Sequence, residues 1–208
     1  MPKFPEPPPP AELAKLKADE ITLAAGTLCW RIYFAGGPRP SAWSAFRAYG
    51  PNEASRFDHH EPPAREQERR ILYIAARVLT CIAEVFQETR TIEVSRNSPW
   101  LVGFRLARAV KLLDLSGSWP TRAGASQAIS SGFRPRARAW SRAIYEAYPS
   151  LAGLRYPSSM DGNQPAYAFY ERAERALPDA PEFHRALNDP AIAAVVDAAG
   201  KQFGYFVV

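Results

Sequence analysis

The segment from Thr27 to Phe34, which reads Thr-Leu-Cys-Trp-Arg-Ile-Tyr-Phe, decides how the chain can fold. Its β-branched and aromatic residues are typical of a strand, and the run Gly36-Gly37-Pro38 ends it. A second apolar strand, Ile71–Ile74, passes at once into a helix over residues 76–89, where apolar residues recur at helical spacing. These elements predict a mixed α+β core.

Working outward from this core, the same patterns predict further short strands and helices in one domain, with no internal repeat. The additional strands are expected at residues 92–94, 100–106, 110–115, 154–156, 167–170 and 203–208. The additional helices are expected at residues 11–18, 136–148 and 191–199, and residues 122–131 form a helix or a turn. Residues 35–70 are predicted to be an irregular loop, which at that length is usually functional or mobile. We expect residues 1–20 to be a proline-rich lead-in with a short helix, and residues 21–208 to be a single domain.

The composition is that of a globular protein with a basic surface. Of the 208 residues, 47% are hydrophobic and 23% are charged, and the formal net charge is +5. This balance suits nucleic acid, a phosphate-rich small ligand or an acidic protein partner, and it is equally consistent with a genomic preference for arginine codons. Two cysteines, Cys29 and Cys81, are too few for a disulfide framework. Without a secretion core or an apolar run of about 20 residues, the expected location is the cytoplasm, with no membrane association.

Several common site motifs are missing from the sequence. There is no Gly-x-Gly-x-x-Gly after a strand, no phosphate-binding Gly-x-x-x-x-Gly-Lys, no Gly-x-Ser-x-Gly elbow and no zinc-ligand spacing. The adjacent His59 and His60 are interpreted as solvated loop residues. The chemistry should therefore depend on arginine, tyrosine, serine and carboxylate, a combination that suits binding the phosphates of a dinucleotide and stabilising a cationic sugar.

Four positions combine these residue types, and each allows two interpretations. Arg31, with Tyr33 on the same face, either reaches water from an edge strand or points at phosphate in a cleft. Arg56 is either a solvated loop residue or a ligand of phosphate. Glu84, flanked by apolar residues, lies on a helix margin or faces a polar cleft, and Ser158 either caps a turn or offers a hydroxyl to a site.

In this order along the chain, the four positions resemble the RES-domain family, which is named for its arginine, glutamate and serine. Proteins of this family are toxins of bacterial toxin–antitoxin pairs. The resemblance covers roughly residues 28–175, and Ser55 stands where a glycine commonly precedes the family's Arg-Phe. The matching stretches are Trp30–Tyr33, Ser55–Phe57, Leu72–Ala75, Ala83–Glu84, Leu113–Leu115, Ala139–Ala143 and Gly153–Ser158.

The resemblance implies an α+β fold like that of ADP-ribosyltransferases, with a split β-sheet, flanking helices and NAD⁺ bound across the split. It implies cleavage of the nicotinamide–ribose bond by hydrolysis or phosphorolysis, or transfer of ADP-ribose to a protein. NAD⁺ is then a substrate and not a redox cofactor, and no metal is implied. An Xre-type antitoxin is the implied partner, which would also mediate any contact with DNA. A homodimer within the toxin–antitoxin complex is left open.

The resemblance also implies roles for individual residues. A carboxylate beside the ribose stabilises the positive charge of an oxocarbenium-like transition state, and Glu84 is the candidate. The residues expected to take part in catalysis are Glu84, Arg31 and Ser158. The residues expected to bind NAD⁺ are Arg31, Tyr33, Arg56, Tyr73 and Ser158. In this scheme the two arginines hold the pyrophosphate, and the tyrosines pack against nicotinamide or adenine. Ser158 either bonds the nicotinamide ribose or orients Glu84.

Three other functions compete with NAD⁺ breakdown. Transfer of ADP-ribose to a specific intracellular protein uses the same residues. A basic nucleic-acid-binding module would draw on two arginine groups, although no recognised nucleic-acid motif accompanies them. These groups are Arg134, Arg136, Arg138 and Arg142, and Arg65, Arg69 and Arg70. A pure interaction role with a decayed site is disfavoured, because Arg31, Tyr73, Glu84 and Ser158 are all present.

Overall fold

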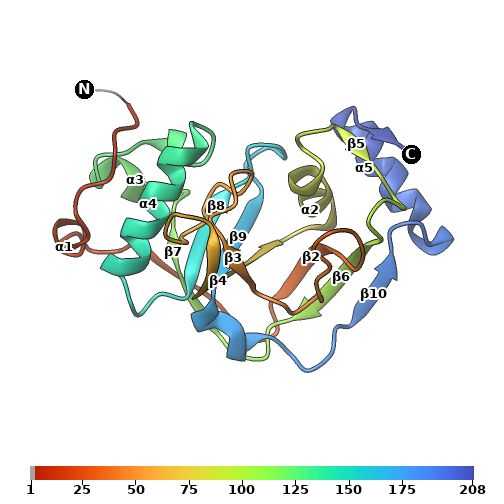
Figure 1. Ribbon diagram of the computed structural model, residues 1–208, viewed down its shortest axis with the longest axis horizontal. Helices are drawn as coiled ribbons and strands as arrows, with labels where there is room; N and C mark the ends of the chain where they lie inside the picture. Colours follow the sequence, from red (N-terminus) through yellow and green to blue (C-terminus); the bar gives the residue numbers. More distant parts are fainter. Residues whose placement is uncertain (1–2) are drawn as a thin grey trace.

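A nine-stranded mixed sheet runs through the molecule in the order β1-β7-β8-β9-β4-β2-β6-β10, and β3 pairs with β4 (Figure 1). The structure is a computed structural model and describes residues 3–208. The strands of this sheet are β1 (Glu20–Leu23), β2 (Leu28–Phe34), β3 (Arg47–Gly50), β4 (Arg65–Ala75), β6 (Pro99–Arg105), β7 (Val110–Asp114), β8 (Gly153–Pro157), β9 (Pro165–Tyr170) and β10 (Phe183–Ala186). Two short strands, β5 (Thr91–Ile92) and β11 (Phe206–Val207), form a separate parallel pair.

The helices flank the sheet at both ends, as Figure 1 shows. They are α1 (Pro10–Leu13), α2 (Val78–Val85), α3 (Trp119–Arg122), α4 (Arg134–Ala147) and α5 (Ala193–Phe203), with 3₁₀ turns η1 (Gln127–Ile129), η2 (Glu171–Ala176) and η3 (Pro190–Ile192). Among residues 3–208, no helix combines the length and apolar character needed to cross a membrane. The expected α+β class is confirmed.

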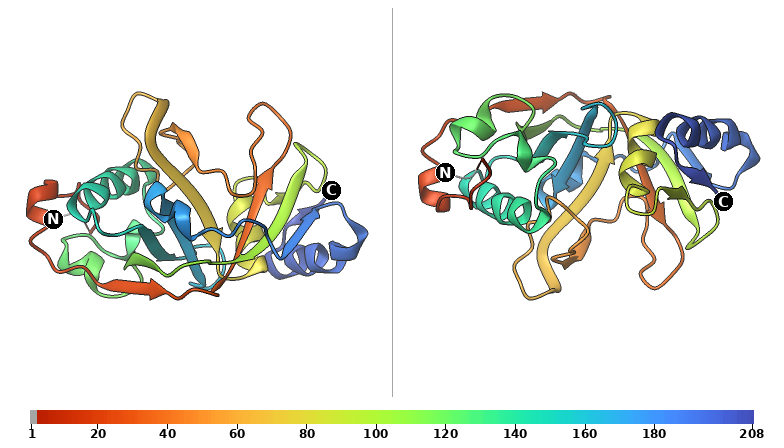
Figure 2. Two further views of the ribbon diagram at one scale, coloured as in Figure 1. Left: turned by 90° about the horizontal axis from the view of Figure 1, so that it is seen from below. Right: turned by 90° about the horizontal axis from the view of Figure 1, so that it is seen from above.

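The sheet is split between β2 and β4. These strands pair at one position only, Trp30 with Ala75, whereas β2 pairs with β6 along its whole length. Beyond Trp30 the two strands diverge, and Figure 2 shows β4 and β2 spreading apart like the arms of a V. Because no ladder joins the arms there, side chains of both strands are free to face a space between them.

The N-terminal segment packs against α4. Phe4 is buried, and the carbonyl oxygen of Pro5 accepts a hydrogen bond of 2.8 Å from the indole of Trp140. Helix α1 is shorter than the 11–18 expected from the sequence, because the chain leaves the helix after Leu13. The Tyr148 hydroxyl lies 2.9 Å from the carbonyl oxygens of both Leu13 and Leu16 and can donate its one proton to either, which ties this segment to the C-terminal end of α4.

Several sequence-based boundaries are corrected by the structure. The loop expected at residues 35–70 contains β3 and the first half of β4, a charged arm whose ladder partner is β3. Strands β1 and β10 and turn η2 were not expected. The last strand is only Phe206–Val207, since α5 continues to Phe203. The strand at Thr27–Phe34 and the helix at residues 136–148 are confirmed within two residues.

The interpretation of His59 and His60 as solvated loop residues is wrong. Both side chains are completely buried. The His59 ring packs against both Tyr145 and Tyr170, at centroid distances of 4.4 and 4.5 Å. The Nδ1 atom of His60 contacts the carboxylate of Asp58. The aromatic residues that enclose His59 come from α4 and β9, far along the chain, so nothing local could indicate this burial.

Candidate active site

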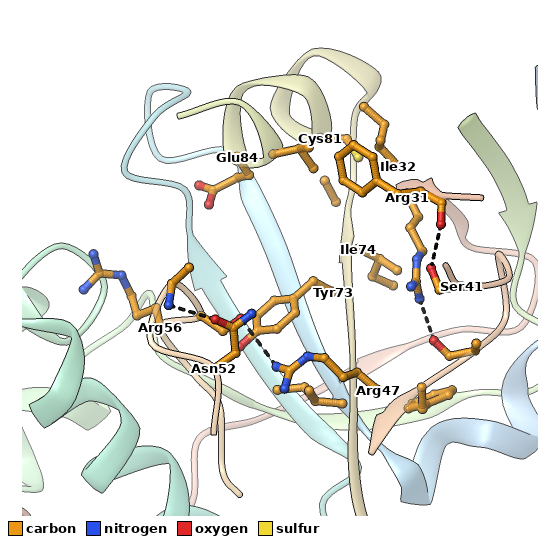
Figure 3. A pocket seen from close by; sticks show the side chains of 18 of the residues that line it. Arg31, Ile32, Ser41, Arg47, Asn52, Arg56, Tyr73, Ile74, Cys81 and Glu84 are labelled. Atoms are coloured by element: carbon orange, nitrogen blue, oxygen red, sulfur yellow. Dashed lines mark hydrogen bonds between the residues drawn. The ribbon is translucent and has the colours of Figure 1, made fainter. Parts of the chain in front are cut away.

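A cavity of about 780 Å³ occupies the split between β2 and β4 (Figure 3). Strand β2 provides Arg31, Ile32 and Phe34 to the cavity wall. Strand β4 provides Glu66, Ile71 and residues 73–75. Helix α2, the loop after β3 and the start of α4 complete the walls. Their cavity-lining residues include Glu84, Gln87, Asn52, Ser55, Arg56, Ser130 and Arg134.

Helix α2 brings Glu84 to the cavity. Strand β4 ends at Ala75 and α2 begins three residues later, so the helix starts beside the point where the sheet splits. Cys81, Ile82 and Ala83 are buried against the core, and Glu84 follows on the side that faces the cavity. In Figure 3 its carboxylate points toward the wall that carries Arg56. Of the two interpretations of Glu84, the structure therefore selects the polar cleft.

Few hydrogen bonds hold the carboxylate of Glu84. Its Oε1 accepts a bond of 2.5 Å from the Ser158 hydroxyl, and its Oε2 lies 3.4 Å from Nε2 of Gln87. Burial raises the pKa of Glu84, and the hydrogen bond from Ser158 and the charge of Arg56 partly oppose this rise. A carboxylate that burial disfavours is available to stabilise positive charge that develops near it.

Ser158 lies beneath Glu84 and not in the cavity wall. Its side chain is 1% exposed, while the next residue, Ser159, lines the cavity. The Ser158 oxygen accepts hydrogen bonds of 3.1 Å from the backbone N–H groups of Met160 and Asp161. Its proton is thereby directed to Glu84, so Ser158 contacts the candidate catalytic carboxylate directly.

Arg31 projects into the cavity from an interior strand, since β2 lies between β4 and β6. This excludes the interpretation as an edge-strand arginine. Its guanidinium donates one hydrogen bond of 3.2 Å to the Ala45 carbonyl, and no carboxylate of residues 3–208 lies within 4.0 Å of it. Burial lowers the pKa of Arg31 to about 10, so it remains charged at neutral pH. A partly buried guanidinium without an ionic partner has lost hydration that the protein does not replace, which favours a ligand of opposite charge.

Arg56 lies on the opposite wall from Arg31 (Figure 3). It donates a hydrogen bond of 2.5 Å to the Gly132 carbonyl, just before α4, and within the described chain it also has no carboxylate within 4.0 Å. Burial and the nearby charge of Arg134 lower the pKa of Arg56, whereas Glu84 raises it. Two uncompensated cations thus stand on either side of the cavity.

The two tyrosines proposed from the sequence lie in different places. Tyr73 lines the cavity, and its buried hydroxyl meets no hydrogen-bond partner in residues 3–208. Tyr33 is not in the cavity wall, and its hydroxyl lies 2.7 Å from Nε2 of His184 on β10. The structure therefore brings Arg31, Arg56, Tyr73 and Glu84 together, with Ser158 behind Glu84, and leaves Tyr33 outside.

Three cavity arginines were missed as site residues in the sequence. Arg39 lies 4.7 Å over the ring of Tyr49, and Arg47 donates 2.8 Å to the buried carboxylate of Asp58. Arg134 reaches from α4 to the turn that follows α2, where it pairs with Glu88 at 2.5 Å. In the sequence, Arg134 was considered only as part of an arginine group that a nucleic-acid-binding module would draw on. No local signal marks Arg39 or Arg47, because both reach the cavity only through tertiary packing.

The cavity as a whole combines excess positive charge with one buried carboxylate. Its lining contains five arginines, Arg31, Arg39, Arg47, Arg56 and Arg134, against the carboxylates of Glu66 and Glu84. Such a distribution suits an elongated ligand that carries phosphates and a group on which positive charge develops.

The α+β sheet is split, and the helix that follows β4 carries a carboxylate that faces the split, which agrees with the fold implied by the resemblance to the RES-domain family. The sequence model of the RES domain family matches residues 28–193, and the chain belongs to that family. Among solved structures, the M.tuberculosis MbcT-MbcA toxin-antitoxin complex contains a similar chain, with a TM-score of 0.58 and 15% identity. The match covers 91% of this chain and 97% of that chain. The comparison with curated proteins gave no match.

Proposed function

We propose that this protein is the toxin of a toxin–antitoxin pair and that it degrades NAD⁺ by cleaving the bond between nicotinamide and ribose. The observation that carries this proposal is the placement of Glu84 in a cavity flanked by Arg31 and Arg56, two guanidinium groups that have no carboxylate partner among residues 3–208. Membership of the RES family and a fold shared with the toxin–antitoxin structure support the assignment.

In the proposed reaction, the arginines bind the pyrophosphate and position the nicotinamide ribose beside Glu84. The bond from ribose C1′ to the pyridinium nitrogen breaks, and its electron pair goes to the ring nitrogen. Nicotinamide leaves as a neutral molecule, so no general acid is needed. Glu84 stabilises the oxocarbenium-like ribose, and losing such electrostatic stabilisation costs on the order of 10²–10³ in rate. An acceptor then attacks C1′ and releases a proton.

The acceptor is water, phosphate or a protein nucleophile, and the three products differ. A protein acceptor would make the enzyme an ADP-ribosyltransferase, which remains the second candidate because the same cavity serves both reactions. The nucleic-acid alternative loses support, because most of its arginines are paired with acidic residues. These pairs are Arg134–Glu88, Arg136–Glu6, Arg142–Glu61, Arg69–Glu61, Arg69–Glu146 and Arg70–Glu174.

The partner that we propose is an Xre-type antitoxin that covers the cavity. The excess of arginine in the cavity wall would favour an acidic segment of such a partner. NAD⁺ enters this scheme as the substrate.

The proposal is tested by incubating purified protein with NAD⁺, with and without phosphate, and measuring free nicotinamide by chromatography. The protein must first be separated from any antitoxin. We expect nicotinamide release, and the ribose-containing product identifies the acceptor. Folded protein that is free of inhibitor and releases no nicotinamide, with no labelled protein formed from labelled NAD⁺ in a lysate, would contradict it.

A further inference from the structure

The loop that carries Ser158 is attached to α2 at two points. The first is the hydrogen bond from Ser158 to Glu84. The second is a hydrogen bond of 2.6 Å from the Thr80 hydroxyl to Oδ2 of Asp161. Thr80 and Glu84 are four residues apart and therefore lie on the same side of the helix, one turn from each other. A single contact would let the loop rotate, whereas two contacts fix its orientation.

We propose that Thr80 and Asp161 are positioning residues for catalysis, which hold Ser158 in the geometry that directs its proton to Glu84. This inference rests on the proposed function of the Glu84 cavity and identifies part of the machinery that supports it. Neither residue lines the cavity, so both act through Ser158 and not on the substrate.

The backbone of the loop transmits this constraint over a short path. The N–H group of Asp161 donates to the Ser158 oxygen at 3.1 Å, while the side chain of the same residue accepts the bond from Thr80. With Met160 N–H also donating, both lone pairs of the Ser158 oxygen are occupied. The hydroxyl can then act toward Glu84 only as a donor. If Asp161 moved, its N–H group would no longer bond the Ser158 oxygen, and the Ser158 hydroxyl could turn away from Glu84.

The burial of Asp161 supports a role beyond stability. Thr80 is fully buried and Asp161 is 6% exposed, yet within residues 3–208 no cation lies within 4.0 Å of this carboxylate. Apart from Thr80, its side chain has one weak contact, at 3.4 Å, with the amide of Gln202 on α5. Burying a carboxylate without an ion pair is costly for folding. A neutral side chain would fill the same space at lower cost, so the carboxylate is better explained by the position that it fixes.

The titration of Glu84 reports on this geometry, because few neighbouring groups titrate in the acid range. The charges that face it are Arg56 from the loop before β4 and Arg134 from α4. Burial raises the pKa of Cys81 on the same helix to about 12 and raises the pKa of Tyr156 and of Tyr205 as well. The cysteine and the two tyrosines therefore stay protonated while Glu84 titrates.

The experiment compares Thr80→Val with Thr80→Ser. Valine keeps the shape but removes the hydroxyl, and serine keeps the hydroxyl. In Thr80→Val we expect kcat for nicotinamide release to fall on the order of 10- to 100-fold with little change in KM, because substrate contacts remain while Glu84 is misplaced. The acid limb of the pH profile should move to higher pH, since a weaker bond from Ser158 lets the pKa of Glu84 rise. Thr80→Ser should behave as wild type.

A second readout separates this inference from the proposed function. The Glu84 carboxyl is titrated by ¹³C NMR, with its signal assigned by loss in Glu84→Gln, which needs no NAD⁺ turnover. We expect Thr80→Val to raise the pKa of Glu84 and to have no further effect in a Ser158→Ala background. If Thr80→Val does not fold, Asp161→Leu, which offers no acceptor to the Thr80 hydroxyl, takes its place in the same measurements. An unchanged Glu84 titration in a folded variant, or a shift that persists without Ser158, would overturn the inference.

Discussion

Two glutamates withdrawn from solvent, Glu84 in the cavity and Glu171 at the end of β9, are treated in opposite ways by the fold. Glu171 accepts hydrogen bonds from the Arg70 N–H at 3.0 Å and the Tyr145 hydroxyl at 2.7 Å, and His59 Nε2 lies at 3.6 Å. Burial alone would raise the pKa of Glu171, but these contacts lower it to about 2. Glu84 has one strong hydrogen bond, and burial raises its pKa.

The difference separates a structural carboxylate from one that is held ready for chemistry. Glu171 is satisfied by the protein itself, so its charge stabilises the fold. Glu84 is incompletely satisfied, and its charge gains most from a cation that forms beside it. The same contrast holds for the arginines, because Arg70 pairs with Glu174 at 2.7 Å whereas Arg31 has only a backbone carbonyl. Arg31, Arg56 and Glu84, whose charges are not matched by an ion pair within residues 3–208, all line the cavity where the substrate is proposed to bind.

The largest effect outside Glu84 is expected from Arg31→Ala. Removing the unpaired guanidinium should reduce the affinity for NAD⁺ by about 2–5 kcal/mol, the range for truncating one partner of a buried charge pair. Arg155→Ala is the matched control, because Arg155 is paired with Asp114 at 2.7 Å and does not line the cavity. Binding is measured by calorimetry in a Glu84→Gln background, so that NAD⁺ is not consumed. If Arg31→Ala and Arg155→Ala lost equal affinity for NAD⁺, the distinction between paired and unpaired arginines would be contradicted.

The next effect is on stability, in Glu171→Gln. Amide replacement weakens the bonds from Arg70 N–H and Tyr145, so the free energy of unfolding at neutral pH should fall by about 2 kcal/mol. Nicotinamide release by the folded protein should not change. Chemical denaturation measures the free energy of unfolding, and the chromatographic assay measures nicotinamide release. A loss of activity without a loss of stability would show that Glu171 is not a purely structural group.

The sequence predicted the elements that carry Arg31 and Glu84, because these elements have a local pattern. The apolar strand around Arg31 and the apolar helix that carries Glu84 are visible as periodicity, and the order of the motifs indicated the family. The environment of Glu171 was not predicted, because it is built from His59, Tyr145 and the backbone of β4, which meet only in three dimensions. For the same reason His59 was expected in solvent.

Charge pattern explains the other misses. Residues 65–70 of β4 are mostly charged, so they lack the alternation that marks a strand, yet pairing with β3 extends the strand through them. Arg134 was grouped with neighbouring helix arginines, although only Arg134 among them lines the cavity. Arginine density in the sequence indicates charge, and only the fold shows which of these arginines reach the cavity.

A smaller effect is expected in the acid dependence of stability. The pKa of Glu171 is lowered from 4.5 to about 2, so its contribution is fully present above pH 4.5 and is lost as the pH falls toward 2. Over this interval the free energy of unfolding of the wild type should fall more steeply than that of Glu171→Gln. Denaturation curves recorded at several pH values give the dependence of the free energy of unfolding on pH for each protein. The same dependence in the wild type and in Glu171→Gln would contradict the role assigned to Glu171.

The smallest effect is a gain of stability in Glu84→Gln. A carboxyl group whose pKa is raised on folding favours the native state below its ordinary pKa of 4.5, and this advantage disappears as the pH rises through the folded value. Glutamine carries no charge to desolvate, so the melting temperature of the variant should exceed that of the wild type at neutral pH. The difference between the melting temperatures of the variant and the wild type should become smaller as the pH is lowered. A variant that melts lower at neutral pH would show that the charge of Glu84 stabilises the fold.

The most direct test of the central claim is nicotinamide release from NAD⁺ by the wild type, Glu84→Gln and Glu171→Gln, each purified free of antitoxin and shown to be folded. The account predicts that the wild type and Glu171→Gln release nicotinamide at similar rates. It predicts a loss on the order of 10²–10³ in Glu84→Gln. Wild-type turnover in folded Glu84→Gln would contradict the assignment of Glu84 as the group that stabilises the cationic ribose.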